Sequence, residues 1–455
     1  MSISSAIFRQ YDVRGIVDTD LTVEVAHAIG GAYAALMLER GVAGEVAVGR
    51  DNRPSGDKLR NALVEGLTGA GVNVVDIGVV PTPVLYWSLH HLPVIGGIQI
   101  TGSHNPSEYN GFKLCFGTES LHGHDLQHLL SLIRSNAAPK GKGVVRFEEP
   151  IDRYISDVVE RTGAFARPMK IVYDCGNGAA SLVAPQLMRA LGVNGVGLFC
   201  ESDGTFPNHH PDPTVSENLQ DLIAAVRREG AEMGIAFDGD ADRIGLVDDT
   251  GRIIWGDHIL ILYARDVLAR TGTGQPIIFD VKCSQALTDE ITRAGGIPVM
   301  WKTGHSLIKD KMKEEHAPLA GEMSGHMFFT EGFYGHDDAL YGAARLLRIV
   351  AESGRTVRDL LADVPAFVTT PEIRVECGDD RKFELVERAV AHFRSTHDII
   401  DVDGVRVLFG DGWGLIRASN TQPILVTRYE ARSADRLAAI RHEMESWIRA
   451  QGVEI

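Results

Sequence analysis

The amino-acid sequence predicts an α/β protein of several domains that ends in a smaller α+β domain. The chain has 455 residues, too many for one hydrophobic core when a domain usually takes about 100–200 residues. Short apolar runs alternate with segments of helical period over most of the chain, which is typical of α/β layers. Toward the C-terminus this alternation gives way to short strands grouped around two helices.

Apolar runs that are nearly continuous in Val and Ile predict strands buried on both faces, as in the sheets of α/β domains. These strands are Val46–Gly49, Val72–Ile77, Ile95–Thr101, Lys170–Asp174, Gly234–Asp238, Ile277–Val281 and Ile297–Trp301. The segments between them have a helical period. These helices are Val23–Glu39, Lys58–Ala70, Ser181–Leu191, Glu217–Arg228, Asp257–Arg270 and Ser284–Ala294.

The C-terminal part of the chain has a different order of elements, which predicts a small α+β domain. Its predicted strands are Ile373–Glu376, Gly404–Leu408, Gly414–Ala418 and Leu425–Ala431. Its predicted helices are Arg381–Phe393 and Asp435–Arg449.

Several predicted strands end in a polar loop that carries an aspartate, and a helix follows. These loops are Gly49–Arg53, Asp174–Gly178, Asp238–Asp240 and Asp280–Lys282. The recurring order suggests one α/β unit used three times. Stretches containing Pro, Gly and polar residues predict domain limits of 1–148, 149–253, 254–366 and 367–455.

Composition and charge exclude several classes of protein. The chain is 44% hydrophobic and 23% charged, without an apolar run of the roughly 18 residues that a membrane helix needs. The N-terminus has neither a basic nor an apolar segment of the kind that starts a secretory signal. The formal charge of −16 argues against binding to nucleic acid. Five scattered cysteines without a CxxC pair favour a reducing cytoplasm over disulfides or a zinc site.

A first candidate site follows the predicted strand Ile95–Thr101 and reads Thr-Gly-Ser-His-Asn-Pro. Ser103 would project from the end of that strand, at the edge where ligands bind to open α/β sheets. His104 would activate the hydroxyl or only orient the loop, and a serine beside glycine is also an ordinary turn residue. Lys113 comes ten residues later, after Asn110-Gly111-Phe112, which predicts a turn into a short strand.

A second candidate site is formed by Asp238, Asp240 and Asp242, which follow a predicted strand. Three carboxylates at alternate positions repel one another unless a hard cation lies among them, and an all-oxygen site of this kind matches Mg²⁺. An EF-hand is excluded because Arg243 stands where its glycine belongs and Asp249 stands where its glutamate belongs. An acidic turn on the surface is the alternative.

Two further polar loops contain candidate binding residues. Glu322, Ser324 and His326 lie in a glycine-containing loop and suit the recognition of sugar hydroxyls. A second loop suits a phosphate clamp, because an arginine precedes hydroxyl and amide side chains. This loop contains Arg417, Ser419, Asn420 and Thr421. Each loop alone is equally compatible with an ordinary polar turn, and no GxxxxGK[ST] loop indicates bound ATP.

Taken together in this order, the four motifs closely resemble the α-D-phosphohexomutase superfamily, especially its phosphomannomutase/phosphoglucomutase branch. The resemblance extends from Phe8–Gly15 to Arg417–Tyr429. It implies four domains around a central cleft: three related α/β domains with mixed sheets and a C-terminal α+β domain. These would carry, in order, the phosphoserine loop, the metal-binding loop, the sugar-recognition loop and the phosphate clamp.

The resemblance also implies roles for individual residues. Ser103 would be the phosphoserine, and its phosphate would complete the shell of one Mg²⁺ held by Asp238, Asp240 and Asp242. The residues around the transferring phosphoryl group would be Arg14, His104, Lys113, Arg243 and His326. The residues that bind the substrate would be Tyr11, Lys282, His305, Glu322, Ser324, His326, Arg417, Ser419, Asn420 and Thr421.

The implied activity interconverts hexose 1-phosphate and hexose 6-phosphate of glucose, mannose or both. Phospho-Ser103 would act through a bound hexose 1,6-bisphosphate, with glucose 1,6-bisphosphate as activator and small phosphosugars as the partners; no obligate protein partner is evident. Met323 matches the mannose/glucose branch, since the phosphoglucosamine branch typically has Gln there. Lys113 is the first candidate general base, its pKa lowered by neighbouring arginines and metal, and His326 is the second.

Three alternatives remain at this stage: a phosphatase using the same phosphoserine, a phosphoglucosamine mutase and a non-catalytic sugar-phosphate binding protein. Retention of Ser103, the three aspartates and Lys113 argues against mere binding. Two residues depart from the family pattern. Ala241 replaces a common glycine in the aspartate loop, and His336 stands where the family is often aromatic.

Overall fold

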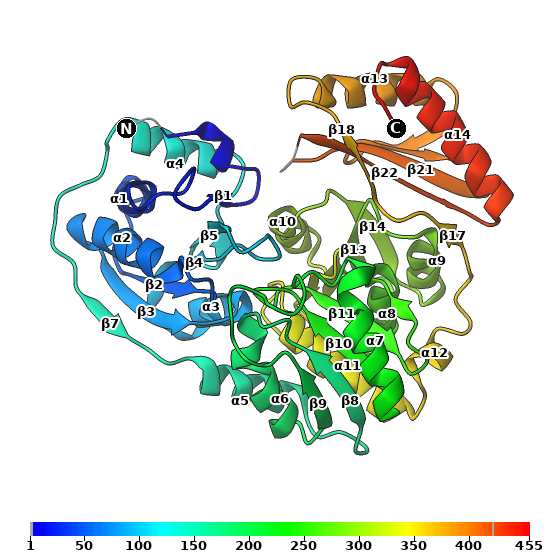
Figure 1. Ribbon diagram of the computed structural model, residues 1–455, viewed down its shortest axis with the longest axis horizontal. Coiled ribbons are helices and arrows are strands. Elements are labelled where there is room, and N and C mark those ends of the chain that lie inside the picture. The colour runs from blue at the N-terminus through cyan, green and yellow to red at the C-terminus, as the bar shows by residue number, and fades with distance from the viewer. Residues whose placement is uncertain (1–2, 421–422) are drawn as a thin grey trace.

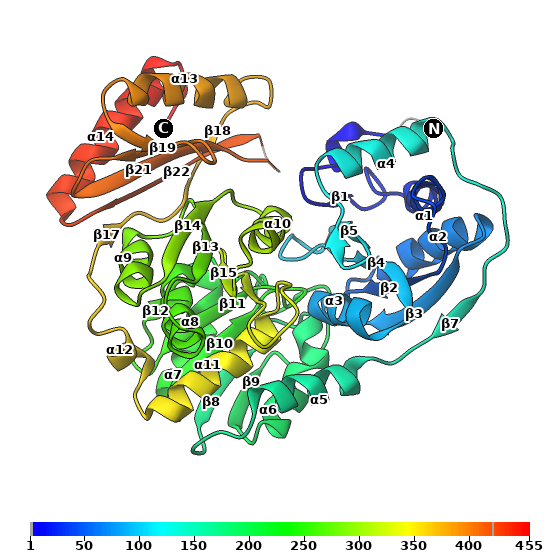
Figure 2. The ribbon, with the colours of Figure 1, turned by 180° about the vertical axis from the view of Figure 1, so that it is seen from behind.

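The computed structural model describes residues 3–420 and 423–455, which form four sheets that follow one another along the chain. Figures 1 and 2 show the N-terminal sheet, in blue and cyan, and the C-terminal sheet, in orange and red, at separate ends of the molecule. The second and third sheets, in green, lie together between them.

The first sheet has seven strands in the order β1-β5-β4-β2-β3-β7, with β6 paired to β5. It is mixed, since β2, β3, β4 and β7 are parallel whereas β1 and β5 run antiparallel to their neighbours. Its strands are β1 Val13–Ile16, β2 Glu45–Arg50, β3 Asn73–Val79, β4 Val94–Ile100, β5 Tyr109–Phe116, β6 Glu119–Ser120 and β7 Val145–Phe147. Its helices are η1 Ser5–Ile7, α1 Val23–Glu39, α2 Gly56–Gly69, α3 Thr82–His91 and α4 His124–Arg134.

The second sheet has the strand order β12-β11-β10-β8-β9 and is also mixed. Its strands are β8 Lys170–Asp174, β9 Asn194–Leu198, β10 Met233–Phe237, β11 Ile244–Asp248 and β12 Ile253–Ile254. Its helices are α5 Ile151–Thr162, η2 Ala179–Leu182, α6 Ala184–Ala190, η3 Ser216–Leu219 and α7 Gln220–Glu229.

The third sheet repeats this plan in the order β14-β13-β15-β16. Its strands are β13 Pro276–Asp280, β14 Ile297–Trp301, β15 Leu319–Gly321 and β16 Met327–Phe329. Its helices are α8 Gly256–Thr271, α9 Gln285–Arg293, α10 His305–Glu315, α11 Ala339–Ser353 and α12 Val357–Leu360.

The C-terminal sheet is antiparallel, and two helices pack on it, which confirms the predicted α+β domain. Its strands are β17 Val368–Thr369, β18 Ile373–Glu376, β19 Asp398–Ile400, β20 Val405–Leu408, β21 Gly412–Ala418 and β22 Ile424–Ala431. The helices are α13 Lys382–Arg394 and α14 Ala434–Ala450.

The structure corrects three local predictions, one of which is the helix Glu217–Arg228, since it begins as the 3-10 helix η3 and continues as α7. Asn110-Gly111-Phe112 is not a turn but part of β5, where Gly111 lets β1 approach closely: a Cβ there would lie 2.3 Å from the Val13 carbonyl oxygen. The predicted helix Ser181–Leu191 is divided into η2 and α6. Pro185 lies at the start of α6, because proline lacks the N–H that an interior helical position must donate.

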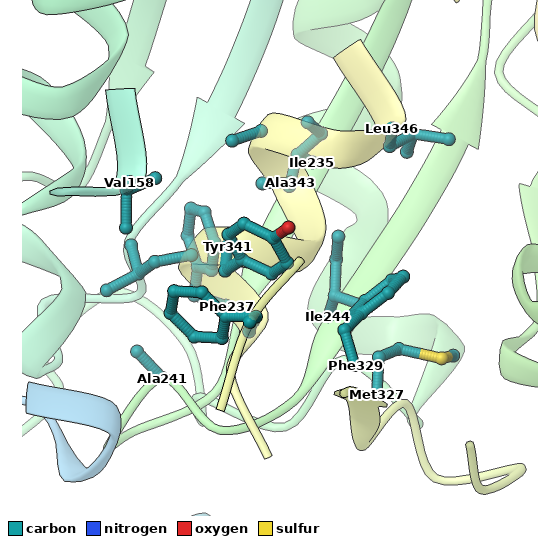
Figure 3. Packing of buried hydrophobic residues seen from close by; sticks show 14 of the residues in the cluster. Val158, Ile235, Phe237, Ala241, Ile244, Met327, Phe329, Tyr341, Ala343 and Leu346 are labelled. Carbon is teal, nitrogen blue, oxygen red and sulfur yellow. The ribbon is translucent and has the colours of Figure 1, made fainter. Parts of the chain in front are cut away.

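A single hydrophobic cluster joins the first three sheets and supports the aspartate loop between β10 and β11. In Figure 3, Phe237 of β10 and Ile244 of β11 lie near Tyr341 of α11 and Met327 of β16. Ala241, at the turn of the aspartate loop, belongs to the same cluster. The loop is therefore packed against residues of the third sheet as well as its own.

Throughout residues 3–420 and 423–455, each helix falls short of the length and apolar character that crossing a membrane requires.

Candidate functional site

The Ser103 loop leaves the end of β4 in a constrained conformation. Ser103 has a φ of +50°, an uncommon left-handed value for a residue with a side chain, and is 2% exposed. Its N–H donates to Thr101 Oγ1 over 2.8 Å. The Ser103 hydroxyl lies 3.2 Å from Asp238 Oδ2 and 3.1 Å from His104 Nδ1. The backbone thus aims the serine oxygen at the aspartate loop of the second sheet.

Arg53 holds this loop in place, a role that no sequence motif indicates. Its guanidinium is buried and donates to four backbone carbonyls: Ser103 (2.8 Å), Asn105 (2.6 Å), Pro106 (2.5 Å) and Tyr109 (3.0 Å). Asp51 pairs with Arg53 over 3.1 Å and accepts the N–H of Gly102 over 3.1 Å. The only signal in the sequence was the position of Asp51 and Arg53 in a polar loop at a strand end.

The three aspartates form a buried cluster that could hold a metal ion. Asp238, Asp240 and Asp242 are each 0% exposed, and one carboxylate oxygen from each lies within 4.8 Å of the others. Burial and then repulsion by Asp242 and Asp240 raise the pKa of Asp238 well above its usual range. Asp240 Oδ2 accepts from Thr82 and Thr101, while its buried Oδ1 has no hydrogen-bond partner. An unpartnered oxygen among crowded carboxylates fits a cation.

Lys113 lies beside this cluster and differs from its expected state. Its ammonium is 2.5 Å from Asp242 Oδ2 and 3.8 Å from Asp240 Oδ2. Burial alone would lower the pKa of Lys113, but these two carboxylates outweigh it and raise that pKa. The expectation of a lowered pKa is therefore wrong, because Lys113 faces carboxylates from the middle of β5.

Arg243, Arg14 and His104 complete the surroundings of Ser103. Arg14 donates to the Gly102 carbonyl over 3.4 Å and pairs with Asp12 over 2.5 Å. Burial, then Arg243 and Arg14, lower the pKa of His104 well below its usual range, so that its imidazole is neutral. A neutral ring beside the hydroxyl is able to accept a proton.

The loop between β15 and β16 brings His326 to the aspartate cluster. His326 Nδ1 lies 2.7 Å from Glu322 Oε2, and its Nε2 lies 3.1 Å from Asp242 Oδ1. Arg243 Nε lies 3.2 Å from the same Nε2. Ser324 Oγ is 3.4 Å from Nδ1. Burial acts to lower the pKa of His326, but Asp242 outweighs it and raises that pKa.

His305 lies next to His326, at a ring-centre distance of 5.9 Å. Both ring nitrogens of His305 are buried without a hydrogen-bond partner. Asp337 is the nearest carboxylate, 3.6 Å from Nδ1, and also pairs with Lys309 over 3.1 Å. No sequence motif singles out Asp337 or Lys309. Neither ring nitrogen of His305 is therefore satisfied by a hydrogen bond from the described protein.

The second group of predicted binding residues lies around Arg417. Its guanidinium pairs with Asp403 over 3.0 Å, and Asp403 also accepts the N–H of Thr303 over 3.1 Å. Lys282 lies between Asp280 (3.6 Å) and Glu372 (3.4 Å). Two buried cations held by carboxylates from different sheets form a site able to bind an anion.

Tyr11 connects the first sheet with this group. Its hydroxyl donates to the Thr303 carbonyl over 2.6 Å and accepts from Asn420 Nδ2 over 2.7 Å. Ser419 is 7% exposed, whereas Thr421 lies outside the described residues. Glu322 Oε1 accepts the N–H of Gly304 over 2.6 Å. The turn at Thr303 and Gly304 therefore contacts both the His326 loop, through Glu322, and the residues around Arg417, through Tyr11. Hydrogen bonds thus connect residues of all four sheets around one region.

His336, the residue that departs from the family pattern, does not join this region. Its ring packs against Tyr86, His90, Phe333 and Tyr334. It therefore belongs to the packing between α3 and the loop that follows β16.

Four matches to known families cover most of the chain in sequence order. All four are described as phosphoglucomutase/phosphomannomutase: alpha/beta/alpha domain I over residues 5–135, domain II over 152–251, domain III over 255–367 and the C-terminal domain over 372–446.

Comparisons with individual proteins point to the same family as the domain matches. The chain is 47% identical to a phosphomannomutase/phosphoglucomutase of Pseudomonas aeruginosa, with 99% of this chain and 96% of the relative covered. It is 44% identical to a phosphoglucomutase of Neisseria gonorrhoeae, with 99% and 98% covered. A phosphoglucomutase/phosphomannomutase family crystal structure from Burkholderia thailandensis superimposes with a TM-score of 0.92 at 42% identity, covering 99% and 98%.

Proposed function

The chain belongs to the phosphoglucomutase/phosphomannomutase family, and we propose that it interconverts hexose 1-phosphate and hexose 6-phosphate of glucose, mannose or both. The observation that carries this proposal is the position of Ser103, whose hydroxyl lies 3.2 Å from a buried cluster of three aspartates. Arg417 and Lys282 supply an anion site in the same region, as a substrate with a phosphate at either end requires.

We propose that Asp238, Asp240 and Asp242 hold one Mg²⁺ per chain, together with the phosphate on Ser103. All-oxygen ligation supports Mg²⁺ over softer metals. The unpartnered Asp240 Oδ1 supports a bound cation of some kind. When bound, Mg²⁺ supplies charge that polarises the phosphoryl oxygens.

The proposed reaction is two phosphoryl transfers. The phosphoryl group of phospho-Ser103 passes to the free hydroxyl of the hexose monophosphate, whose oxygen loses its proton as the new P–O bond forms. The resulting 1,6-bisphosphate turns over, and Ser103 takes back the other phosphoryl group. Arg14, Lys113 and Arg243 place fixed positive charge around the transferring group, which is the main way that proteins accelerate this reaction. Glucose 1,6-bisphosphate would recharge an enzyme that has lost its phosphate.

We assign the proton transfer to His326 rather than to Lys113. Lys113 is held as an ammonium by Asp242 and Asp240, so it acts as a charge and not as a base. His326 contacts Asp242 on one side and Glu322 on the other, an arrangement that fixes its ring toward the site. Asp242 raises the pKa of His326 as well, but it does so from the near-neutral value of a histidine, so this ring can exchange a proton where a lysine ammonium cannot. His104 is better placed to orient Ser103, which it contacts directly.

We propose that only a few protein groups recognise the substrate, because the same site must accept the sugar in both of its orientations. Glu322, Ser324 and His305 would contact the sugar hydroxyls. The phosphate that is not being transferred would bind to Lys282, Arg417, Ser419, Asn420 and Thr421, with Tyr11 bordering that site. Structures titled as N-acetylphosphoglucosamine mutase of Aspergillus fumigatus contain GlcNAc-6P and magnesium or glucose 1,6-bisphosphate. At 15–16% identity they support the fold alone.

The four sheets support domain limits at 1–148, 149–253, 254–366 and 367–455 as part of this proposal. The five free thiols support a reducing location such as the cytoplasm.

The activity is tested directly by ³¹P NMR of the protein with glucose 1-phosphate or mannose 1-phosphate, Mg²⁺ and a trace of glucose 1,6-bisphosphate. We expect conversion to the 6-phosphate without accumulation of inorganic phosphate. Release of inorganic phosphate as the main product would contradict the proposal and indicate a phosphatase.

The phosphate clamp is tested by Arg417→Ala. Loss of a charge-assisted contact with phosphate removes about 1.5–3 kcal/mol of binding, so we expect KM to rise roughly 10–100-fold. The clamp holds its phosphate equally before and during transfer, so kcat should fall much less. Steady-state kinetics of Arg432→Ala, which removes a half-exposed arginine directly after β22, provides the matched control. An unchanged KM for Arg417→Ala would contradict the assignment.

A further inference from the structure

Cys175 and Cys200 lie close together beside the aspartate loop. The proposed reaction uses neither of them. Cys175 follows β8 and Cys200 follows β9, and the two sulfur atoms are 3.4 Å apart. The strands are parallel neighbours. Phe199 has a φ of +49°, which turns the chain back toward Cys175. Glycine at 197 leaves room for the thiol, since a Cβ there would lie 2.7 Å from Cys200 Sγ.

Backbone hydrogen bonds fix this arrangement. The N–H of Cys175 donates to the Leu198 carbonyl over 3.1 Å, and the N–H of Asn177 donates to the Phe199 carbonyl over 2.9 Å. Asn177 also donates from its side chain to the Glu201 carbonyl. These hydrogen bonds therefore hold the two thiols close to one another.

The two thiols differ in the way that a reactive pair requires. Cys200 is partly exposed, whereas Cys175 is buried. A hydrogen bond from Cys175 lowers the pKa of Cys200 despite partial burial, whereas burial raises the pKa of Cys175. Cys200 is therefore the more reactive thiol and Cys175 its proton-bearing neighbour. The other cysteines, all within the described residues, are buried and have no thiol partner.

We propose that Cys175 and Cys200 are a modification site, a dithiol that hydrogen peroxide oxidises to a reversible disulfide, and that this bond slows phosphoryl transfer. The Cys200 thiolate attacks one peroxide oxygen, giving a sulfenic acid and hydroxide, which takes up a proton to become water. The Cys175 sulfur then attacks the sulfenic sulfur, loses its proton and releases a second water. Two thiols and one peroxide thus give one disulfide and two waters.

The loop that carries Cys175 transmits the change to the aspartates. The N–H of Ala179 donates to the carbonyl of Gly239, which lies between Asp238 and Asp240, over 2.9 Å. Gly178 packs so closely on Gly239 that a Cβ would lie 2.7 Å from its carbonyl oxygen. A disulfide is about 2.05 Å long, so the sulfur atoms must approach by more than 1 Å, and the loop moves with them.

The same loop also contacts the first sheet. Asn52 donates to the Asn177 carbonyl over 2.6 Å and to Ser202 Oγ over 2.9 Å. Asn52 lies next to Arg53, which holds the Ser103 loop. A shift at Cys175 therefore reaches both the serine and the aspartate loops. A misplacement of about 1 Å is able to slow a reaction on the order of 10²-fold.

The test treats the full-length, reduced protein with hydrogen peroxide, then measures free thiols, intact mass and disulfide-linked peptides. We expect the wild type to lose two thiols together through a Cys175–Cys200 disulfide that dithiothreitol reverses. Cys175→Ser and Cys200→Ser should form no such bond, and Cys377→Ser should behave as the wild type. Retention of both thiols, a different pairing, or oxidation of Cys200 to an irreversible acid would overturn the site.

The effect on catalysis rests on the proposed function and has its own readouts. Mutase activity and Mg²⁺ affinity, the latter by calorimetry, are measured for the oxidised protein before and after dithiothreitol. In chains that keep both cysteines, we expect activity and Mg²⁺ affinity to fall on oxidation, activity about 10²-fold, and to recover on reduction. Chains that lack either cysteine should show neither change. A disulfide that leaves activity and Mg²⁺ affinity unchanged would overturn the proposed effect of the disulfide on catalysis. A protein without mutase activity when reduced would contradict the proposed function instead, since thiol loss and Mg²⁺ affinity are measured without substrate.

Discussion

Replacing Ser103 with alanine is expected to reduce mutase turnover by a factor on the order of 10⁴ or more, because the variant has no oxygen to carry the phosphoryl group. The side chains beside the Ser103 hydroxyl, His104 and Asp238, are assigned to orienting the serine and to the metal site, so neither is free to replace it as the carrier. Substrate binding should change little, because the clamp around Arg417 is untouched. The measurements are kcat with glucose 1-phosphate and the Kd of glucose 6-phosphate.

Ser107→Ala is the matched control, since it removes a half-buried hydroxyl four residues further along the same loop. It should retain near-normal turnover. Near-normal turnover of Ser103→Ala itself would disprove the phosphoserine shuttle. If Ser103→Ala lost glucose 6-phosphate binding as well as activity, the loss of activity would be due to a collapsed loop. An unchanged thermal unfolding midpoint of the variant excludes such a collapse.

Asp240→Asn is expected to weaken Mg²⁺ binding by more than about 10²-fold and to lower kcat at ordinary Mg²⁺ concentrations. Loss of groups that merely support a ligand typically weakens metal affinity 10–100-fold, and Asp240 is proposed as a direct ligand. Its Oδ1 is the buried oxygen that lacks a protein partner. Calorimetric titration with Mg²⁺ and activity measured against Mg²⁺ concentration check this prediction.

Asp221→Asn makes the same charge change on the exposed face of α7 and should leave both curves unchanged. If Asp240→Asn bound Mg²⁺ as tightly as the wild type, the aspartate cluster would not be the metal site. Excess Mg²⁺ should restore part of the lost activity, since the change weakens the site without removing Asp238 and Asp242.

The fold was predictable from local patterns because its strands are short, apolar and bounded by polar loops. β8, β14 and α1 begin and end at the predicted residues. β5 was missed at its start because Asn-Gly usually marks a turn. Here Gly111 instead provides space for the neighbouring strand β1, a contact between residues nearly a hundred positions apart that no local pattern shows.

The site was only partly predictable for the same reason. Ser103 and Asp238 stand out because the chemistry of their motifs is local. Arg53 and Thr82 do not, because their roles come from contacts with loops far away in sequence. The charge state of Lys113 also depends on such a contact. Without the distance to Asp242, its pKa was expected to fall, whereas that carboxylate raises it.

The most direct test of the central proposal is the intact mass of the protein before and after treatment with glucose 1,6-bisphosphate and Mg²⁺, followed by peptide mapping. The proposed shuttle predicts a gain of one phosphoryl group located on Ser103, and its loss when a hexose monophosphate is then added in excess. A protein that gains no phosphoryl group and is not already phosphorylated at Ser103, or that carries the group on another residue, would contradict the account.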